Sequence, residues 1–124
     1  MSLDIYLNGK PAHKKCVCVC GHEHDAQEED VLYHANITHN LNDMAEAAGI
    51  YKELWRPDEI PITKAKEMIE PLRLGYSRLV NNPNKFMAYN PKNGWGSYDT
   101  LVEFVAKYLA ACEKYPNAHV TVDR

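Results

Sequence analysis

Thiol and imidazole side chains occupy every second position between residues 16 and 24, in the run C-V-C-V-C-G-H-E-H. Both are preferred zinc ligands, and a tetrahedral zinc site needs four of them at about 2.0–2.3 Å. If residues 16–20 form a strand, the three sulfurs point to one face, and Gly21 allows a turn that brings the histidines back toward them. The run therefore predicts a structural zinc site, with these candidate ligands: Cys16, Cys18, Cys20, His22 and His24.

The spacing leaves the set of four ligands open. Zinc sites usually present C-x-x-C pairs, whereas these cysteines alternate with valine. Cys18 and Cys20 with one of the two histidines are the preferred core of the set, completed by Cys16 or by a distant histidine. The alternative is a hairpin without metal, in which the cysteines pack as small apolar side chains. Residues 10–30 are thus expected to form a hairpin or loop insert, stabilised by metal in the first case.

Length and charge limit the domain count and the class of partner. At 124 residues, the chain is expected to be one domain, 1–124. The formal net charge of −3 argues against a nucleic-acid partner, because nucleic-acid binders carry a basic surplus. The opening M-S-L-D-I-Y-L lacks the features of a signal peptide, and no apolar stretch reaches the roughly 18 residues of a membrane span. We therefore expect a cytoplasmic protein with reduced thiols and no membrane partner.

Hydrophobic periodicity predicts the elements of the fold. Strands are expected at residues 3–7, 16–20, 31–37 and 118–122. In the strand 31–37, one face is expected to carry Val31, Tyr33, Ala35 and Ile37, and the other Leu32, His34 and Asn36. Helices are expected to begin at Thr38, near Thr63, and between Ser97 and Thr100. The predicted fold is α+β, with a small, mostly antiparallel sheet packed against three main helices and a C-terminal strand that returns to the sheet.

Glycine and proline refine these elements. Gly49 is expected to end the first helix, where a left-handed residue is needed. Pro71 is expected to kink the second helix or divide it, because proline removes an amide donor and clashes with the preceding turn. Residues 51–61 and 81–97 are expected to be loops. Cys112 falls on the apolar face of the third helix and is predicted to be core.

The segment N-I-T-H-N at residues 36–40 is the main candidate for a binding site. It is expected at a strand-to-helix junction, where free amides favour anions. Two aromatic loops, residues 55–57 and 90–99, are expected to close over this junction. The candidate ligand-binding residues are Asn36, His39, Asn40, Trp55, Arg56, Trp95 and Tyr98. In the alternative, the asparagines and Thr38 cap the helix and Trp95 anchors the core.

The sequence contains no P-loop, no G-x-S-x-G and no helical H-E-x-x-H. It therefore favours a small accessory protein that binds a protein or small-molecule partner, rather than an enzyme. The alternative is a small metal-dependent hydrolase acting on a phosphorylated or nucleotide-like substrate. In that hypothesis His34 and His39 lie beside the helix N-terminus and Arg56 clamps the anion.

Several tracts resemble a known group of proteins. They are Y-H-A-N-I-T-H-N-L, M-A-E-A-A-G-I-Y, L-W-R-P-D-E, I-T-K-A-K, I-E-P-L, N-P-K-N-G-W-G-S-Y, L-A-A-C-E-K-Y-P-N-A and V-T-V-D-R. The likeness covers residues 3–5 and 31–124 and is to a family of small uncharacterised proteins of bacteriophages, prophages and bacteria. The resemblance implies an intracellular, phage-associated setting and no particular activity. It also implies that the cysteine segment is the most variable part of the chain, which disfavours a catalytic role for the metal.

Overall fold

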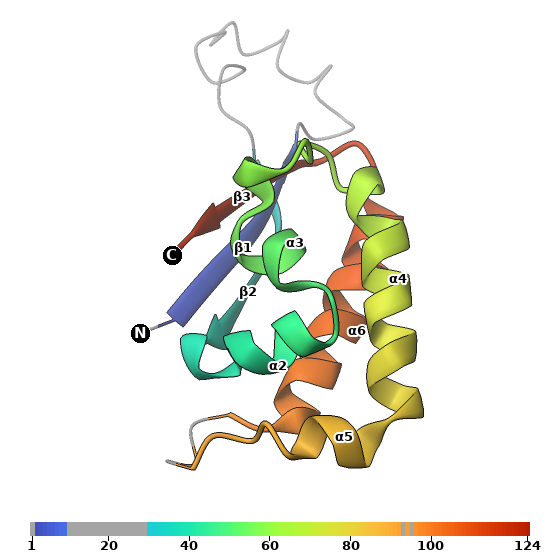
Figure 1. Cartoon of the computed structure of the whole chain (residues 1–124). Coiled ribbons are helices and arrows are strands. Elements are labelled where there is room, and N and C mark those ends of the chain that lie inside the picture. The colour runs from blue at the N-terminus through green and yellow to red at the C-terminus, as the bar shows by residue number, and fades with distance from the viewer. Residues whose placement is uncertain (1, 10–29, 93, 95) are drawn as a thin grey trace, which may run out of the picture.

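The computed structural model describes residues 2–9, 30–92, 94 and 96–124, and the predicted strand at 16–20 lies outside them. Three strands form one sheet in the order β2-β1-β3: β1 (Ser2–Gly9), β2 (Asp30–Thr38) and β3 (His119–Asp123). Both outer strands run antiparallel to β1 (Figure 1). The α+β class and the return of the C-terminal strand to the sheet are therefore confirmed.

One face of the sheet meets the helices and the other meets solvent. Along β1, Leu3, Ile5 and Leu7 are fully buried, while the residues between them are partly exposed. This alternation is typical of an antiparallel sheet that is covered on one side. In the register, Ile5 lies opposite Ala35 on β2 and Val122 on β3.

A β-bulge changes the predicted faces at the start of β2. The register shifts between Leu7 and Asn8, whose partners are Tyr33 and Val31, so that one residue of β2 is unpaired. An extra residue reverses the alternation on one side of the bulge. Val31 is consequently 56% exposed, and Leu32 packs against the core. The prediction that Val31 shares the face of Tyr33, and Leu32 the opposite face, is wrong for this reason.

The strand-to-helix junction follows the predicted capping chemistry. The Thr38 side chain accepts a hydrogen bond from the Asn40 amide at 3.3 Å, at the start of the 3-10 helix η3 (His39–Leu41). Helix α2 (Asn42–Ala47) follows directly. Gly49 then adopts φ 81°, the left-handed conformation expected where this helix ends.

Three short helices occupy segments that were predicted to be loops. They are α3 (Tyr51–Trp55), η4 (Pro57–Glu59) and α5 (Pro83–Met87). Each has at most five residues, which is too short to show a helical period in the sequence. Pro57 and Pro83 stand at helix starts, where the missing amide costs nothing.

Helix α4 (Lys66–Asn81) is continuous through Pro71, so of the two predicted alternatives the division into two helices is wrong and the kink stays a prediction. The buried residues Met68, Leu72 and Gly75 lie on one stripe that spans the proline. Packing of this stripe on both sides of Pro71 holds the helix together although one hydrogen bond is missing.

Helix α6 (Tyr98–Lys114) begins where the sequence predicts, because the Ser97 side chain accepts from the Thr100 amide at 3.4 Å. Cys112 is fully buried on its apolar face, which confirms it as core. Burial raises the pKa of the Cys112 thiol to about 12, so this group is a neutral thiol at pH 7.

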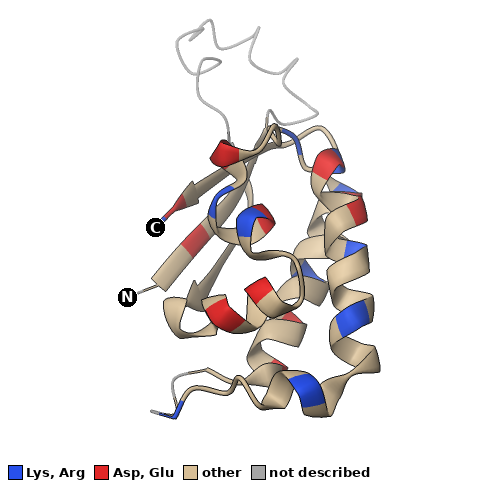
Figure 2. Ribbon diagram, viewed as in Figure 1, with Lys and Arg blue, Asp and Glu red and all other residues tan. Residues whose placement is uncertain are grey.

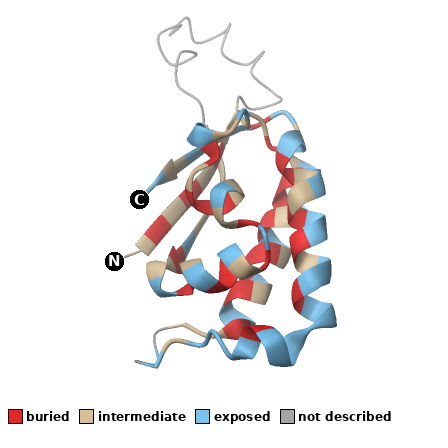
Figure 3. Cartoon of the chain, viewed as in Figure 1, coloured by how far each residue is buried: buried red, intermediate tan, exposed pale blue. Residues whose placement is uncertain are grey.

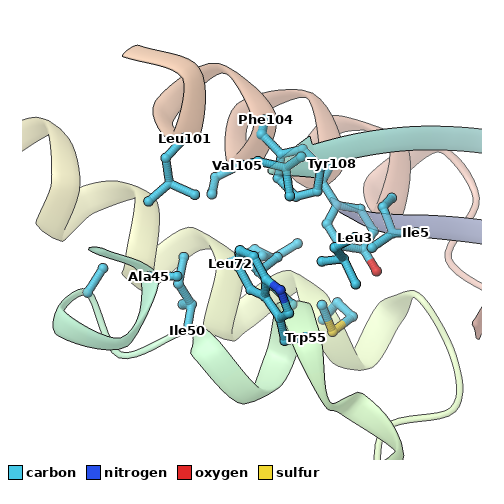
Figure 4. Packing of buried hydrophobic residues seen from close by; sticks show 14 of the residues in the cluster. Leu3, Ile5, Ala45, Ile50, Trp55, Leu72, Leu101, Phe104, Val105 and Tyr108 are labelled. Carbon is cyan, nitrogen blue, oxygen red and sulfur yellow. The ribbon is translucent and has the colours of Figure 1, made fainter. Parts of the chain in front are cut away.

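The core lies between the sheet and the helices, with α6 against β2 and α4 beside α6 (Figures 1 and 3). Figure 4 shows Leu3 and Ile5 of β1 beside Tyr108 of α6, and Trp55 of α3 on the side of Leu72. Tyr108 is fully buried, and its hydroxyl has no hydrogen-bond partner among the described residues. Acidic and basic positions are interspersed on the helices (Figure 2). Within the described part of the chain, no helix has the length and apolar character needed to cross a membrane.

Candidate functional site

The strand-to-helix junction holds a direct contact between two of the predicted site residues. The Trp55 indole Nε1 donates to His39 Nδ1 at 2.8 Å. Because Nδ1 accepts this bond, the neutral His39 ring carries its proton on Nε2. Trp55 thus contacts the predicted junction, but from the end of α3 rather than from a loop.

The second predicted loop also reaches the junction. Gly96 has φ 93°, and a Cβ at this position would lie 2.7 Å from Cγ2 of Thr38 and 3.1 Å from Leu41. This close approach of backbone to side chain requires a glycine. Trp95, a predicted ligand-binding residue of this loop with core anchoring as the alternative, lies outside the described residues.

Trp55 anchors a chain of aromatic and polar contacts. It is 2% exposed and stacks on Tyr51, with ring centroids 5.8 Å apart. The Tyr51 hydroxyl accepts from Arg56 Nε at 3.1 Å, and the Arg56 guanidinium donates to the Glu59 carboxylate at 3.0 Å. Both hydrogen bonds raise the pKa of Arg56 above its usual value. Arg56, the predicted anion clamp, is therefore already engaged within the protein.

The last residue of the chain closes this network, which the sequence did not predict. Arg124 donates to the Trp55 carbonyl oxygen at 2.8 Å and to the Asp58 carboxylate at 2.9 Å. The hydrogen bond from Arg124 lowers the pKa of Asp58 below its ordinary value. We call His39, Tyr51, Trp55, Arg56, Asp58 and Arg124 the sheet-end cluster.

A groove lies beside the sheet-end cluster, between β3 and the segment 57–63. Its volume is about 790 Å³, within the range of about 300–1,000 Å³ that is usual for ligand sites. The lining combines apolar side chains with the Asp58–Arg124 pair at one end; the apolar residues are Pro57, Ile60, Pro61, Ile62, Val120 and Val122. We call this the β3 groove.

The outer edge of β3 is paired at its beginning and open further on. The Val120 amide donates to the Thr63 carbonyl oxygen at 2.9 Å, so the backbone groups of Val120 point away from β1. The Thr63 amide donates instead to the Glu67 carboxylate at 2.8 Å, and β3 and the segment 57–63 separate there. Because direction alternates along a strand, the backbone N–H and C=O of Val122 also point into the β3 groove. Neither has a partner among the described residues.

Asn36 belongs to a different cluster, on the solvent face of the sheet. Its side-chain amide donates to Ser2 Oγ at 2.9 Å and to the Asp4 carboxylate at 3.0 Å. His34 Nε2 lies 3.0 Å from the same carboxylate, and its ring stacks on Tyr6 at a centroid distance of 4.7 Å. The hydrogen bonds from Asn36 and His34 lower the pKa of Asp4. We call these five residues the sheet-face network.

The two remaining predicted residues do not join either cluster. Asn40 is exposed on η3, where its amide is bonded to the Thr38 side chain. Tyr98 is buried at the start of α6, with its hydroxyl donating to the Leu79 carbonyl oxygen at 2.6 Å. Tyr98 therefore ties α6 to the end of α4.

The predicted zinc ligands, Cys16, Cys18, Cys20, His22 and His24, lie outside the described residues. Within the described part, no group of three histidine, cysteine, aspartate or glutamate side chains could hold a metal ion. Comparison of the chain with protein-family models, with curated proteins and with solved structures gives no match. The β3 groove thus offers apolar side chains, the polar side chains of Thr63, His119 and Thr121, the outward backbone groups of Val122 and the Asp58–Arg124 ion pair.

Proposed function

We propose that this protein is a binding module that takes an extended peptide segment of a protein partner into the β3 groove. The observation that carries the proposal is the open outer edge of β3 beside an apolar wall. Strand addition uses these two features, since backbone hydrogen bonds give affinity and pockets for alternate side chains give specificity.

The geometry of the groove fits a short strand rather than a small polar molecule. Val120 and Val122 lie on one side of the groove, and Ile60 and Ile62 on the other. An incoming strand paired with β3 would place every second side chain against these residues. The Asp58–Arg124 pair at the end of the groove offers one charge of each sign to a passing backbone or side chain.

The rival hypothesis of a metal-dependent hydrolase gains less support from the same residues. It needs a free imidazole and a free cation near the helix N-terminus. Nδ1 of His39 is held by Trp55, His34 lies against Asp4, and Arg56 is bonded to Tyr51 and Glu59. A binding role uses the described groups as they stand.

The peptide proposal is tested with a phage-displayed library of random decapeptides and the full-length protein. We expect enrichment of peptides with alternating apolar residues, confirmed with synthetic peptides by fluorescence anisotropy. Val122→Pro removes an amide that points into the groove and keeps the strand's bonds to β1. Loss of one such hydrogen bond should weaken binding by about tenfold.

Tyr6→Phe is the control, because Tyr6 stacks on His34 in the sheet-face network and does not line the β3 groove. It should leave peptide affinity unchanged, whereas Ile62→Asp should abolish it. The proposal fails if no peptide is enriched over an unrelated protein, or if Val122→Pro and Ile62→Asp bind the enriched peptides as well as the parent protein does.

A structural zinc site in the segment between β1 and β2 is a separate part of the proposal and rests on the sequence alone. Protein purified without added metal should contain about one zinc per chain. Cys18→Ser or Cys20→Ser should lose the zinc and lower the melting temperature, because metal-binding free energy contributes to folding. Cys112→Ser should retain the zinc, since Cys112 is buried in α6. Metal-free parent protein would contradict the site.

A further inference from the structure

The second edge of the sheet, β2, is longer than β3 and has no neighbouring strand on its outer side among the described residues. The Val120 amide points away from β1, toward Thr63. β3 pairs with β1 and β1 pairs with β2, and the direction of the backbone groups alternates along each strand. It follows that the N–H and C=O groups of His34 and Asn36 point to the outer side of β2. None of these four groups has a backbone partner within the described part of the chain.

The composition of β2 leaves this edge unprotected. Natural edge strands are usually blunted by lysine, proline or a bulge in their middle. After Asp30 at its start, β2 reads V-L-Y-H-A-N-I-T over residues 31–38, with no proline and no Lys, Arg, Asp or Glu. The bulge lies at the start of the strand, so that residues 33–38 are regular over about 20 Å.

Helix α6 provides a second surface beside this edge. A shallow groove of about 180 Å³ separates it from β2, and its lining is Tyr33, Ala35, Asn36, Thr100, Glu103, Phe104 and Lys107. Glu103 and Lys107 stand one turn apart on the exposed side of the helix and form an ion pair at 3.3 Å. Their side chains are 68% and 66% exposed, so both charges are available to a neighbour.

We propose that β2 pairs with β2 of a second copy of this chain across a two-fold axis, giving a dimer with a six-stranded antiparallel sheet. A two-fold axis at Ala35 would pair His34 with Asn36 of the other copy, whose backbone groups both face outward. The small Ala35 side chains would meet at the axis, where opposing Cα atoms come within about 4.5 Å.

The charges on α6 favour a second copy over an unrelated strand. A two-fold axis brings the two α6 helices together in opposite directions. Glu103 of one copy would then face Lys107 of the other, and the reverse contact follows by symmetry. The Glu103–Lys107 pair of one copy is therefore complementary to the same pair of the other copy. An unrelated partner would need its own matching charges.

The dimer would place the two β3 grooves at opposite ends of one continuous sheet, because β3 lies on the far side of β1 from β2. A partner with two binding segments could occupy both grooves, and its overall affinity would exceed that of either segment. Dimerisation through β2 and peptide binding at β3 are independent, so either can fail without the other.

The test measures the oligomeric state of the full-length protein by sedimentation equilibrium over a range of concentrations. We expect a dimer whose dissociation constant rises by about tenfold for Glu103→Lys and for Lys107→Glu, because each creates like charges across the axis. The double variant Glu103→Lys with Lys107→Glu restores complementarity and should return the constant to that of the parent protein. A mixture of the two single variants should form heterodimers in preference to homodimers.

Glu113→Lys is the matched control, because Glu113 lies on the other side of α6 and is bonded to Arg73 of α4. It should leave dimerisation unchanged. Hydrogen exchange of the His34 and Asn36 amides should slow as the protein concentration rises, with no such change at Val122. A monomer at all concentrations would overturn the proposal, and so would a dimer that is insensitive to the charges at 103 and 107 or that leaves the His34 and Asn36 amides unprotected.

Discussion

The two edges of this sheet carry open backbone groups in different surroundings. At β3, the open part is short and lies beside an apolar groove whose end is held by Trp55, Asp58 and Arg124. At β2, the open part is longer and lies beside an exposed helix with a self-complementary pair of charges. This difference is the reason why we propose a foreign peptide at the first edge and a second copy of the chain at the second.

The two edges are also supported by different parts of the chain. The β3 groove depends on the sheet-end cluster, which joins α3, η4 and the last residue. The end of β2 depends on the 90–97 loop, through the contact of Gly96 with Thr38. Substitutions in these supports should therefore affect one edge at a time.

Trp55→Ala should have the largest effect. It removes a buried indole, its stacking on Tyr51 and its bond to His39, and should lower the free energy of unfolding by about 3–5 kcal/mol. Urea denaturation measures this loss. Peptide binding at β3 should fall, because Arg124 is bonded to the backbone carbonyl oxygen of residue 55, which loses the side chain that anchors it.

The same variant should still dimerise under conditions in which it remains folded. The proposed dimer surface consists of the outer edge of β2 and the exposed side of α6, whereas Trp55 belongs to the sheet-end cluster. Trp55→Phe is a milder companion, which keeps the ring and removes only the N–H donor to His39. Equal loss of peptide binding and of dimerisation in Trp55→Phe would contradict the independence of the two edges.

Gly96→Ala should affect the β2 end. Positive φ costs a non-glycine residue about 1–2 kcal/mol, and the added Cβ would also press against Thr38, so we expect a loss of about 2–3 kcal/mol in unfolding free energy. Dimerisation should weaken, and peptide affinity should stay within about twofold of the parent value.

Gly94→Ala is the matched control for this substitution. Gly94 also has positive φ, at 79°, but a Cβ there would meet nothing within 4 Å. Gly94→Ala should lower the unfolding free energy only by the cost of a positive φ, and should leave dimerisation intact. If Gly94→Ala and Gly96→Ala are equally destabilised, the contact with Thr38 contributes nothing.

Local rules in the sequence were sufficient for much of the fold. Capping by Thr38, the stop at Gly49 and the start of α6 between Ser97 and Thr100 depend on residues within four positions of each other, and all three are confirmed. The faces of Val31 and Leu32 were mistaken because a bulge depends on pairing with β1, which the sequence of β2 alone does not contain. The division of α4 at Pro71 was mistaken because packing outweighed the local preference of proline.

The candidate site was only partly predictable for the same reason. The contact of His39 with Trp55 follows from an aromatic loop predicted to cover a junction. Arg124 and Asp58 are 66 residues apart, and no local pattern connects them. The β3 groove forms where the segment 57–63 leaves β3, which is a property of the tertiary structure.

Tyr108→Phe should change stability without affecting either edge. The Tyr108 hydroxyl is buried with no hydrogen-bond partner among the described residues, so the protein carries the cost of its desolvation. Removing the oxygen should leave the unfolding free energy unchanged or raise it by up to about 1 kcal/mol. Thermal and urea denaturation test this, and a loss above about 1 kcal/mol would show that the hydroxyl has a partner. Peptide affinity and dimerisation should be unaltered.

The smallest expected effect is a pH dependence that differs between the edges. The pKa of Asp58 at β3 is lowered by the hydrogen bond from Arg124, and that of Asp4 beside β2 by those from Asn36 and His34. A lowered pKa means that each carboxylate stabilises the fold above its ordinary pKa of 3.8, and that this contribution is lost as the pH falls through the lowered value. Asp58 is exposed and Asp4 is partly exposed, so each effect should be small and should decrease with salt.

Amide hydrogen exchange at the two edges, compared between pH 5 and pH 3, separates the contributions. Asp58→Asn should remove the acid response near Val122 and leave that near Asn36, and Asp4→Asn should do the reverse. Because asparagine has no charge to lose, each variant should show the same protection at both pH values at its own edge, after correction for the intrinsic exchange rate. An acid response that persists at β3 in Asp58→Asn would mean that another group holds Arg124 against the end of the groove, and the ion pair would then no longer explain how this edge is kept open.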